Sequence, residues 1–143
     1  MRFFALIAVL ITLATPALAN GFASPSGNIR CYLDVFSPAP IDETDMVCLI
    51  FDAGWEYPPE RGGNDGDCDL DRTRMVILPP DGAPYLETAC HGDVFWPEPL
   101  GTISYGSEWS LMGYTCRMAR DGVRCGNGRG DGFHLRRAEV IFD

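Results

Sequence analysis

Cys90-His91-Gly92-Asp93 sets an imidazole and a carboxylate two residues apart, the residue types that a general base and its orienting group require. No serine lies in a Gly-x-Ser-x-Gly turn, and an even number of cysteines leaves no free thiol as a nucleophile. The other histidine, His134, falls on an expected strand, where we expect it to face solvent. We therefore predict no catalytic residue and a protein that is not an enzyme, and we keep a small hydrolase using His91 and Asp93 as the weakest of three functions.

Acidic residues alternate along Asp65–Asp71, as they do in loops that surround a calcium ion with oxygen ligands. The EF-hand template requires glycine at its sixth position and a bidentate glutamate at its twelfth, where this chain has Leu70 and Val76. The segment therefore favours a polar loop held by Cys68. We expect no metal and no cofactor, and calcium binding by Asp65–Asp71 is the alternative.

The chain contains six cysteines: Cys31, Cys48, Cys68, Cys90, Cys116 and Cys125. Zinc sites use closely spaced cysteine and histidine pairs, but the closest two cysteines here are Cys116 and Cys125. Six cysteines allow about fifteen disulfide connectivities, and spacing alone does not select one. We favour sequence neighbours, with the pairs Cys31–Cys48, Cys68–Cys90 and Cys116–Cys125. Each bridge would then contribute about 3 kcal/mol in the chain-entropy model.

Several aromatic residues fall in or beside expected loops, where they could form a face that binds a sugar or a peptide. These residues are Trp55, Tyr57, Trp96, Tyr105 and Trp109. Large rings also seal the open ends of small β domains, so a structural role competes with the binding role. We treat the five as a candidate binding face that fails if the rings are scattered or buried.

The first 19 residues have the features of a cleaved export signal. Arg2 gives a positive start, residues 3–13 are apolar apart from Thr12, and small residues at 17–19 follow Pro16. An apolar run of roughly a dozen residues is too short to span a membrane, which needs about 20. We therefore expect a mature chain of residues 20–143 in the periplasm or the medium. No cysteine follows the cleavage site directly, so we expect no lipid on a new N-terminal cysteine and no membrane anchor.

The charge of the chain excludes some partners. It has no lysine, and cleavage would leave ten arginines against twenty acidic residues, a net charge of −10. Such a field repels nucleic acid and anionic lipid, and it would speed association with a cationic partner. An acidic surface also keeps an exported protein soluble. We expect no nucleic-acid partner and a monomer whose partner is an envelope component or a cationic protein.

Short runs of β-branched, aromatic and aliphatic residues alternate with turn signals, and no stretch keeps helical spacing for three turns. The expected strands are 28–34, 46–51, 73–78, 85–90, 110–118, 123–126 and 132–137. The pattern predicts one all-β domain over residues 20–143, an antiparallel sandwich or barrel of about seven short strands stapled by disulfides.

The cysteines favour one register for the hairpin around residues 119–122. If Arg120 and Asp121 form a two-residue loop, counting outward pairs Met118 with Val123 and Cys116 with Cys125. Directly opposed residues at a non-hydrogen-bonded site have Cα atoms about 4.5 Å apart, which suits a disulfide. A bulge at Gly122 would instead turn the two sulfurs to opposite faces of the ribbon.

The sequence around the cysteines resembles a family of small exported bacterial proteins of unknown function. The resemblance rests on Ser24-Pro25-Ser26-Gly27-Asn28-Ile29-Arg30-Cys31, on Cys90-His91-Gly92-Asp93, on Tyr105-Gly106 and on Gly122-Val123-Arg124-Cys125-Gly126-Asn127. The chain departs from the family pattern at Asp131, where a histidine is usual, and at Arg72, where a tryptophan often stands. The resemblance implies an exported disulfide domain and no particular activity.

Three functions follow in order of preference. The first is a non-catalytic binding or structural module of the bacterial envelope, because the scaffold is stable and lacks a catalytic grouping. The second is an acidic inhibitor of a cationic secreted enzyme such as a lysozyme or a protease. The third is the small hydrolase described above.

Overall fold

The structure is a computed structural model that describes residues 20–34, 38–58, 68–92 and 100–143. The expected all-β fold is confirmed, because the described elements are strands and one short 3-10 helix, η1 (Ile41–Glu43). The strands are β1 (Gly21–Ala23), β2 (Ile29–Leu33), β3 (Met46–Ile50), β4 (Asp71–Leu78), β5 (Tyr85–His91), β6 (Gly101–Thr102), β7 (Glu108–Leu111), β8 (Tyr114–Ala119), β9 (Gly122–Gly126), β10 (Gly132–Leu135) and β11 (Val140–Phe142). A search of these same residues for a helix able to cross a membrane finds none.

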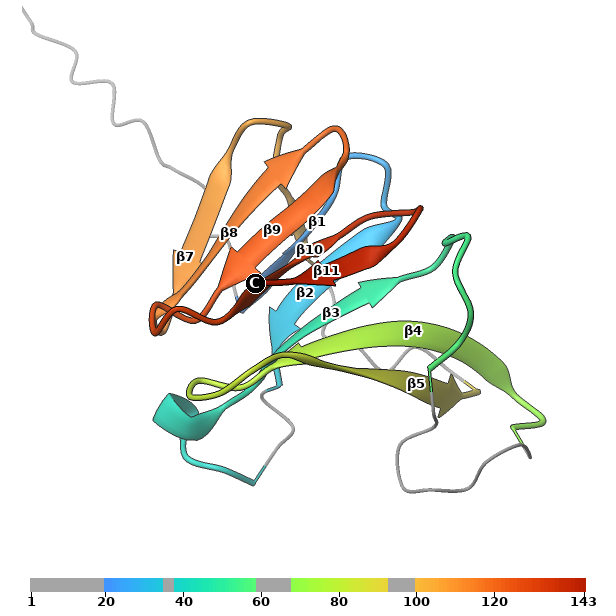
Figure 1. Cartoon of the computed structure of the whole chain (residues 1–143), viewed down its shortest axis with the longest axis horizontal. Helices are drawn as coiled ribbons and strands as arrows, with labels where there is room; N and C mark the ends of the chain where they lie inside the picture. The colour runs from blue at the N-terminus through green and yellow to red at the C-terminus, as the bar shows by residue number, and fades with distance from the viewer. Residues whose placement is uncertain (1–19, 35–37, 59–67, 93–99) are drawn as a thin grey trace, which may run out of the picture.

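The strands form two sheets that pack as a sandwich (Figure 1). The six-stranded sheet has the order β5-β4-β3-β2-β1-β6, and the five-stranded sheet has the order β11-β10-β9-β8-β7. Neighbouring strands are antiparallel except β1 and β6, which pair in parallel. Neither sheet closes on itself, so the sandwich expectation holds and the barrel alternative does not.

The main apolar core lies between the two sheets. It explains the alternation along β8, where Tyr114, Cys116 and Met118 are buried while Thr115 and Arg117 are exposed. A second cluster lies on the other face of the six-stranded sheet and consists of Tyr32, Val47, Leu49, Met75, Ile77 and Ala89. Because both faces of β3 are covered, that strand is buried at every position.

Three disulfides staple the sandwich, and they join the sequence neighbours that were favoured. Cys31–Cys48 links β2 to β3, and Cys116–Cys125 links β8 to β9, each with a Cα–Cα distance of 4.1 Å. Cys68–Cys90 ties the segment before β4 to β5, with a Cα–Cα distance of 5.8 Å. Four of the sulfurs are therefore in the core, and the third bridge lies nearer the surface.

The β8–β9 hairpin has the register that the cysteines favoured. Cys116 pairs with Cys125, Met118 with Val123 and Ala119 with Gly122, which leaves Arg120 and Asp121 as the two loop residues. The bulged alternative is therefore wrong for this hairpin.

The described residues form more strands than the seven expected. The expected strand at 110–118 is two strands, β7 and β8, because Met112 and Gly113 make a tight turn with φ values of 52° and 86°. Tight turns of this kind usually have Asn-Gly, because few other residues adopt positive φ. This turn has Met in the first of the two positions, so the sequence did not indicate it. The other additional strands, β1, β6 and β11, have only two or three residues each and are too short for a visible alternation.

Candidate functional site

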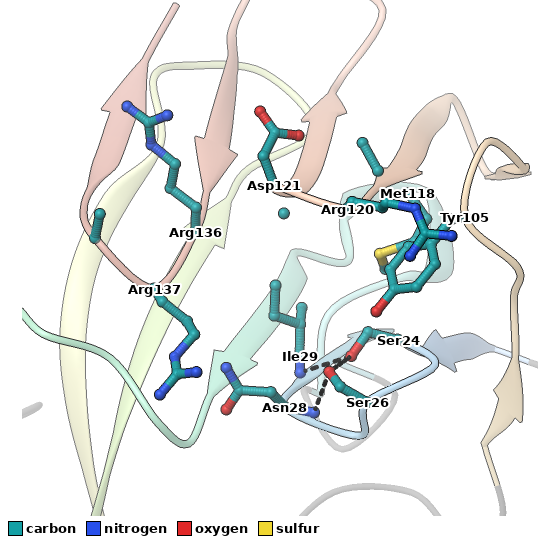
Figure 2. A pocket seen from close by; sticks show the side chains of 13 residues that line it. Ser24, Ser26, Asn28, Ile29, Tyr105, Met118, Arg120, Asp121, Arg136 and Arg137 are labelled. Carbon is teal, nitrogen blue, oxygen red and sulfur yellow. Dashed lines mark hydrogen bonds between the residues drawn. The ribbon is translucent and has the colours of Figure 1, made fainter.

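A cleft of about 290 Å³ opens at one end of the sandwich, where turns of both sheets come together (Figure 2). Its lining consists of Ser24, Ser26, Asn28, Ile29, Tyr105, Met118, Ala119, Arg120, Asp121, Gly122, Arg136, Arg137 and Ala138. A wider hollow of about 720 Å³ shares Ser26, Asn28, Tyr105, Arg120 and Arg137 with it and continues toward Arg30, Phe51 and Asp52. The two are therefore parts of one site, which we call the arginine cleft.

The turn between β1 and β2 forms the lower wall of the arginine cleft in Figure 2. Gly27 has a φ of 73°, and its N–H donates to the carbonyl of Ser24 at 2.9 Å, which closes the turn. Ile29 N–H donates to Ser24 Oγ at 3.1 Å, and Ser24 N–H donates to the carbonyl of Ile29 at 2.8 Å. Ser26 Oγ likewise accepts the Asn28 N–H at 3.3 Å, and it lies 3.2 Å from Ser24 Oγ, so both hydroxyl groups hold the turn.

Asn28 joins the β1–β2 turn to the segment that follows β3. Its side-chain N–H donates to the carbonyl of Asp52 at 2.9 Å, and its Oδ1 accepts the Asp52 N–H at 2.7 Å. Asp52 in turn pairs with Arg137 of the β10–β11 turn, and Gly54 N–H donates to the Arg137 carbonyl at 2.7 Å. This chain of contacts holds the two sheets at a fixed opening on this side of the cleft.

Arg120 and Tyr105 form the opposite wall. Arg120 Cζ lies 5.0 Å from the centre of the Tyr105 ring, a cation–π contact that restrains the guanidinium (Figure 2). Tyr105 is held against β8 because the N–H of the next residue, Gly106, donates to the carbonyl of Met118 at 2.7 Å. The guanidinium is thereby presented at the rim with its N–H edges available to a ligand.

Positive charge collects at this cleft on a chain that is acidic overall. The lining of its two parts contains four arginines, Arg30, Arg120, Arg136 and Arg137, and two aspartates, Asp52 and Asp121. The whole sequence has the opposite balance, with eleven basic and twenty acidic residues. Arginine presents paired donors that match carboxylate and phosphate oxygens, so the cleft can bind an anion.

His134 lies beside the cleft on β10, and the expectation that it faces solvent is wrong. Its exposed fraction is 2%, and its Nε2 lies 3.6 Å from Asp121 Oδ2. Burial lowers the pKa of His134, and the positive charges of Arg124 and Arg136 lower it further against the opposing effect of Asp121. The ring is therefore neutral at pH 7 and supports the wall that carries Asp121.

One protein-family model matches residues 5–142, and its description is "Family of unknown function (DUF6636)". The chain belongs to this family. No curated protein matches the chain, and no solved structure matches it.

Three of the four segments that carry the resemblance to exported proteins of unknown function contribute to the arginine cleft of this DUF6636 protein. Ser24–Asn28 forms one wall, Tyr105 supplies the ring that contacts Arg120, and Gly122, the first residue of β9, is also part of the lining. Much of this pattern has a structural reason, because Gly27 and Asn28 shape the turn and its attachment. The cleft arginines could not be predicted from the sequence, since only their proximity in space distinguishes them from other surface arginines.

The five candidate binding-face aromatics do not share one surface. Trp109 is 3% exposed, and its ring centre lies 5.4 Å from that of Phe22 in the core, so its expected surface role is wrong. Trp96 lies outside the described residues. Among the other three, only Tyr105 lines the arginine cleft.

Trp55 and Tyr57 pack around a buried arginine instead of lining an open groove. Arg74 Cζ lies 5.2 Å from the Trp55 ring centre and 3.9 Å from that of Tyr57, and its Nη2 donates to the Trp55 carbonyl at 2.5 Å. Trp55 Nε1 donates to the carbonyl of Arg136 at 3.3 Å. Trp55 therefore supports the cleft wall that carries Arg136, and Tyr57 packs on Arg74 behind it.

The remaining sequence candidates are described only in part. His91 Nε2 lies 2.8 Å from Thr73 Oγ1 across the β4–β5 pair, while Asp93 lies outside the described residues, so the hydrolase dyad stays a prediction. Asp65 and Asp67 also lie outside them, whereas Asp69 and Asp71 are exposed.

One group of sulfurs in the described chain has the proximity of a metal site. The sulfurs of Cys31, Cys48 and Cys125 lie within 4.8 Å of one another. All three belong to disulfides, so they are not thiolate ligands here.

Proposed function

We propose that the chain is an exported, non-catalytic binding module of the bacterial envelope, and that its ligand places an anionic group in the arginine cleft. The signal-like residues 1–19 and the three disulfides support export to the periplasm or the medium, because disulfides persist in oxidising compartments. The gathering of four arginines at one opening of an acidic protein is the observation on which the binding role depends.

The acidic remainder of the molecule is compatible with an anionic ligand. Charges more than about 8–10 Å apart in water are largely screened at physiological salt, so the arginines nearest the ligand dominate once it is bound. The surrounding negative field instead discourages nonspecific binding of large polyanions such as nucleic acid. A compact ligand with one or two negative charges suits this arrangement.

The test is a binding titration of the purified protein, by calorimetry or by NMR shift mapping, with a panel of anions and neutral counterparts. The anions are inorganic phosphate, glucuronate and N-acetylphenylalanine, and the neutral probes are glucose and N-acetylphenylalanine amide. We expect at least one anion to bind and its neutral counterpart to bind more weakly. Arg120→Gln should reduce that anion's affinity about tenfold or more, because it removes a charged hydrogen-bond donor.

Arg117→Gln is the matched control for Arg120→Gln. It makes the same change of charge on the same hairpin, but Arg117 is exposed on β8 and is absent from the lining of the cleft. We expect its affinity to stay within about twofold of the wild type, since Arg117 is exposed to screening by solvent and does not line the cleft. Equal losses in the two variants, or no binding of any anion, would contradict the proposal.

The inhibitor of a cationic secreted enzyme stands as the second candidate, and the net charge of −9 supports it. An immobilised cationic lysozyme or protease would then capture the chain, and added salt would weaken capture sharply because the attraction is electrostatic. Arg120→Gln would leave this binding intact or strengthen it. The two functions thus predict opposite effects of one substitution.

A further inference from the structure

Resting on the proposed function, we propose that the ligand of the arginine cleft is an amphipathic carboxylate. Its single carboxylate would bind Arg120 at the rim, and an apolar group about the size of one large side chain would enter the smaller part of the cleft.

The interior of the smaller cleft is apolar. Ile29 and Met118 form its inner wall, and their exposed fractions are only 5% and 1%. Ala119, Gly122 and Ala138 add small apolar surfaces around them. A volume of about 290 Å³ is at the lower end of the range for small-molecule sites, roughly 300 Å³ upward, so it has room for one ring or branched chain.

Charged groups lie at the rim, on opposite sides of this apolar interior. Figure 2 shows Arg120 and Arg137 on the two walls of the cleft, with Ile29 between them. A ligand carboxylate at the mouth could contact the Arg120 guanidinium while its apolar group points toward Ile29. Tyr105 lines the same mouth with Arg120 and adds a hydroxyl donor there.

The ion pairs that these arginines already form favour a ligand with one negative charge over a ligand with several. Arg136 pairs with Glu139 and Arg137 pairs with Asp52, so two of the guanidinium charges are already balanced. Arg120 contacts the Tyr105 ring and pairs with no carboxylate of the described residues. Because the ring already restrains Arg120, little side-chain entropy is lost when a carboxylate binds it.

The wider hollow distinguishes two sources of such a ligand. If the carboxylate is the C-terminus of a peptide, the preceding amide groups would extend along the hollow past Ser26, Asn28 and Asp52. If it is a simple apolar acid, the hollow would stay empty. The two sources share the carboxylate and the apolar group, and they differ in the amide.

The experiment holds the carboxylate constant and varies the apolar group. N-acetylglycine, N-acetylleucine and N-acetylphenylalanine are titrated into the wild-type protein, and we expect affinity to rise at least about tenfold from glycine to phenylalanine. N-acetylphenylalanine amide should bind about tenfold or more weakly than the acid. 3-Phenylpropanoate, which lacks the amide, separates the sources: equal affinity indicates a simple acid and weaker affinity a peptide terminus.

Ala119→Leu and Ala138→Leu test the site within the protein. Each adds bulk to the lining of the smaller cleft, so each should reduce binding of N-acetylphenylalanine more than that of N-acetylglycine. Ala138 is exposed, so its variant should fold even if Ala119→Leu does not. Thermal melting of each variant checks this.

The possible failures are distinguishable. A series that is flat from glycine to phenylalanine, or a preference for phosphate or glucuronate, would overturn the amphipathic carboxylate while leaving an Arg120-dependent anion site intact. If no anion of the panel shows binding that Arg120→Gln weakens, the proposed function is overturned as well.

Discussion

Tyr114 connects the two sheets through its hydroxyl group. Its one O–H proton is shared between the carbonyls of Thr44 and Leu78, which lie 2.9 and 3.1 Å from the hydroxyl oxygen and belong to the opposite side of the core. Burial raises the pKa of Tyr114 well above the usual range, and the nearby charge of Asp45 raises it further. The phenol therefore remains protonated and works as a cross-sheet donor.

Tyr114→Phe should lower the free energy of unfolding by about 1–3 kcal/mol, because it leaves two buried carbonyls without this donor while the ring keeps its packing. Urea unfolding measures the change. Tyr57→Phe is the control, since Tyr57 is exposed and stacks on Arg74 through its ring. A cost for Tyr114→Phe no larger than for Tyr57→Phe would show that the two hydrogen bonds contribute no net stability.

His134 should make the stability of the protein depend on pH. Its pKa is lowered in the folded state by burial and by Arg124 and Arg136, whereas the unfolded chain takes up the proton near pH 6.5. The contribution of neutral His134 to the free energy of unfolding is therefore fully present above about pH 6.5, and it is lost as the pH falls toward the lowered pKa of the folded state. Unfolding of the wild type and His134→Gln at several pH values measures it: the variant should lose less stability on acidification, and parallel losses would contradict the assignment.

At the scale of the elements, the β8–β9 hairpin needs glycine at its last turn position for a reason beyond the turn itself. Gly122 has a φ of 129°, and a Cβ there would lie 2.1 Å from the backbone carbonyl oxygen of Leu135. Gly82, in the β4–β5 turn, has the same φ of 129°, but a Cβ there would meet nothing within 4 Å. A side chain at Gly82 would therefore meet backbone strain alone, whereas a side chain at Gly122 would meet the same strain and a steric clash with β10.

Gly82→Ala should cost about 1–2 kcal/mol, the penalty for a side chain at positive φ. Gly122→Ala should cost about 1–3 kcal/mol more, because β10 must also move away from the added methyl group. Paired urea unfolding curves of the two variants give the difference. Equal costs would indicate that the contact between β9 and β10 relaxes freely.

The elements that could be predicted are those specified by local rules. The two-residue turn and the alternation around Cys116 and Cys125 fix the β8–β9 register, because only that register brings both sulfurs to one face. The β7–β8 turn could not be predicted, since Met112 adopts a conformation that its side chain disfavours. The short strands β1 and β11 exist because neighbours pair with them, and this information lies elsewhere in the chain.

At the scale of the whole molecule, the arginine cleft is a product of the sandwich and of no single segment. Its walls come from the β1–β2 turn, Tyr105, the β8–β9 hairpin and the β10–β11 turn, which lie up to about a hundred residues apart in the sequence. Sequence reasoning identified Tyr105 but selected Trp109 with it, because periodicity alone does not distinguish a ring at the rim from one in the core. The disulfide pairs were accessible to sequence reasoning because each joins consecutive cysteines.

The three disulfides should be reduced in a fixed order under native conditions. Cys90 is exposed and Cys68 is half-buried, whereas the core bridges Cys31–Cys48 and Cys116–Cys125 are almost completely buried. A dithiol must reach a sulfur to attack it, so mild reduction should open Cys68–Cys90 alone, and the core bridges should open only when the chain unfolds.

Reduction at increasing dithiol concentration, followed by alkylation and peptide mass spectrometry, reads out this order. We expect a plateau with label at Cys68 and Cys90 only, in a protein that still melts cooperatively but is about 3 kcal/mol less stable. Full labelling should appear together with loss of the melting transition, because the core bridges of a chain this small contribute a large share of a typical 5–15 kcal/mol. Simultaneous labelling of all six cysteines in folded protein would contradict this order, because it would show that the reductant reaches the core disulfides as readily as Cys68–Cys90.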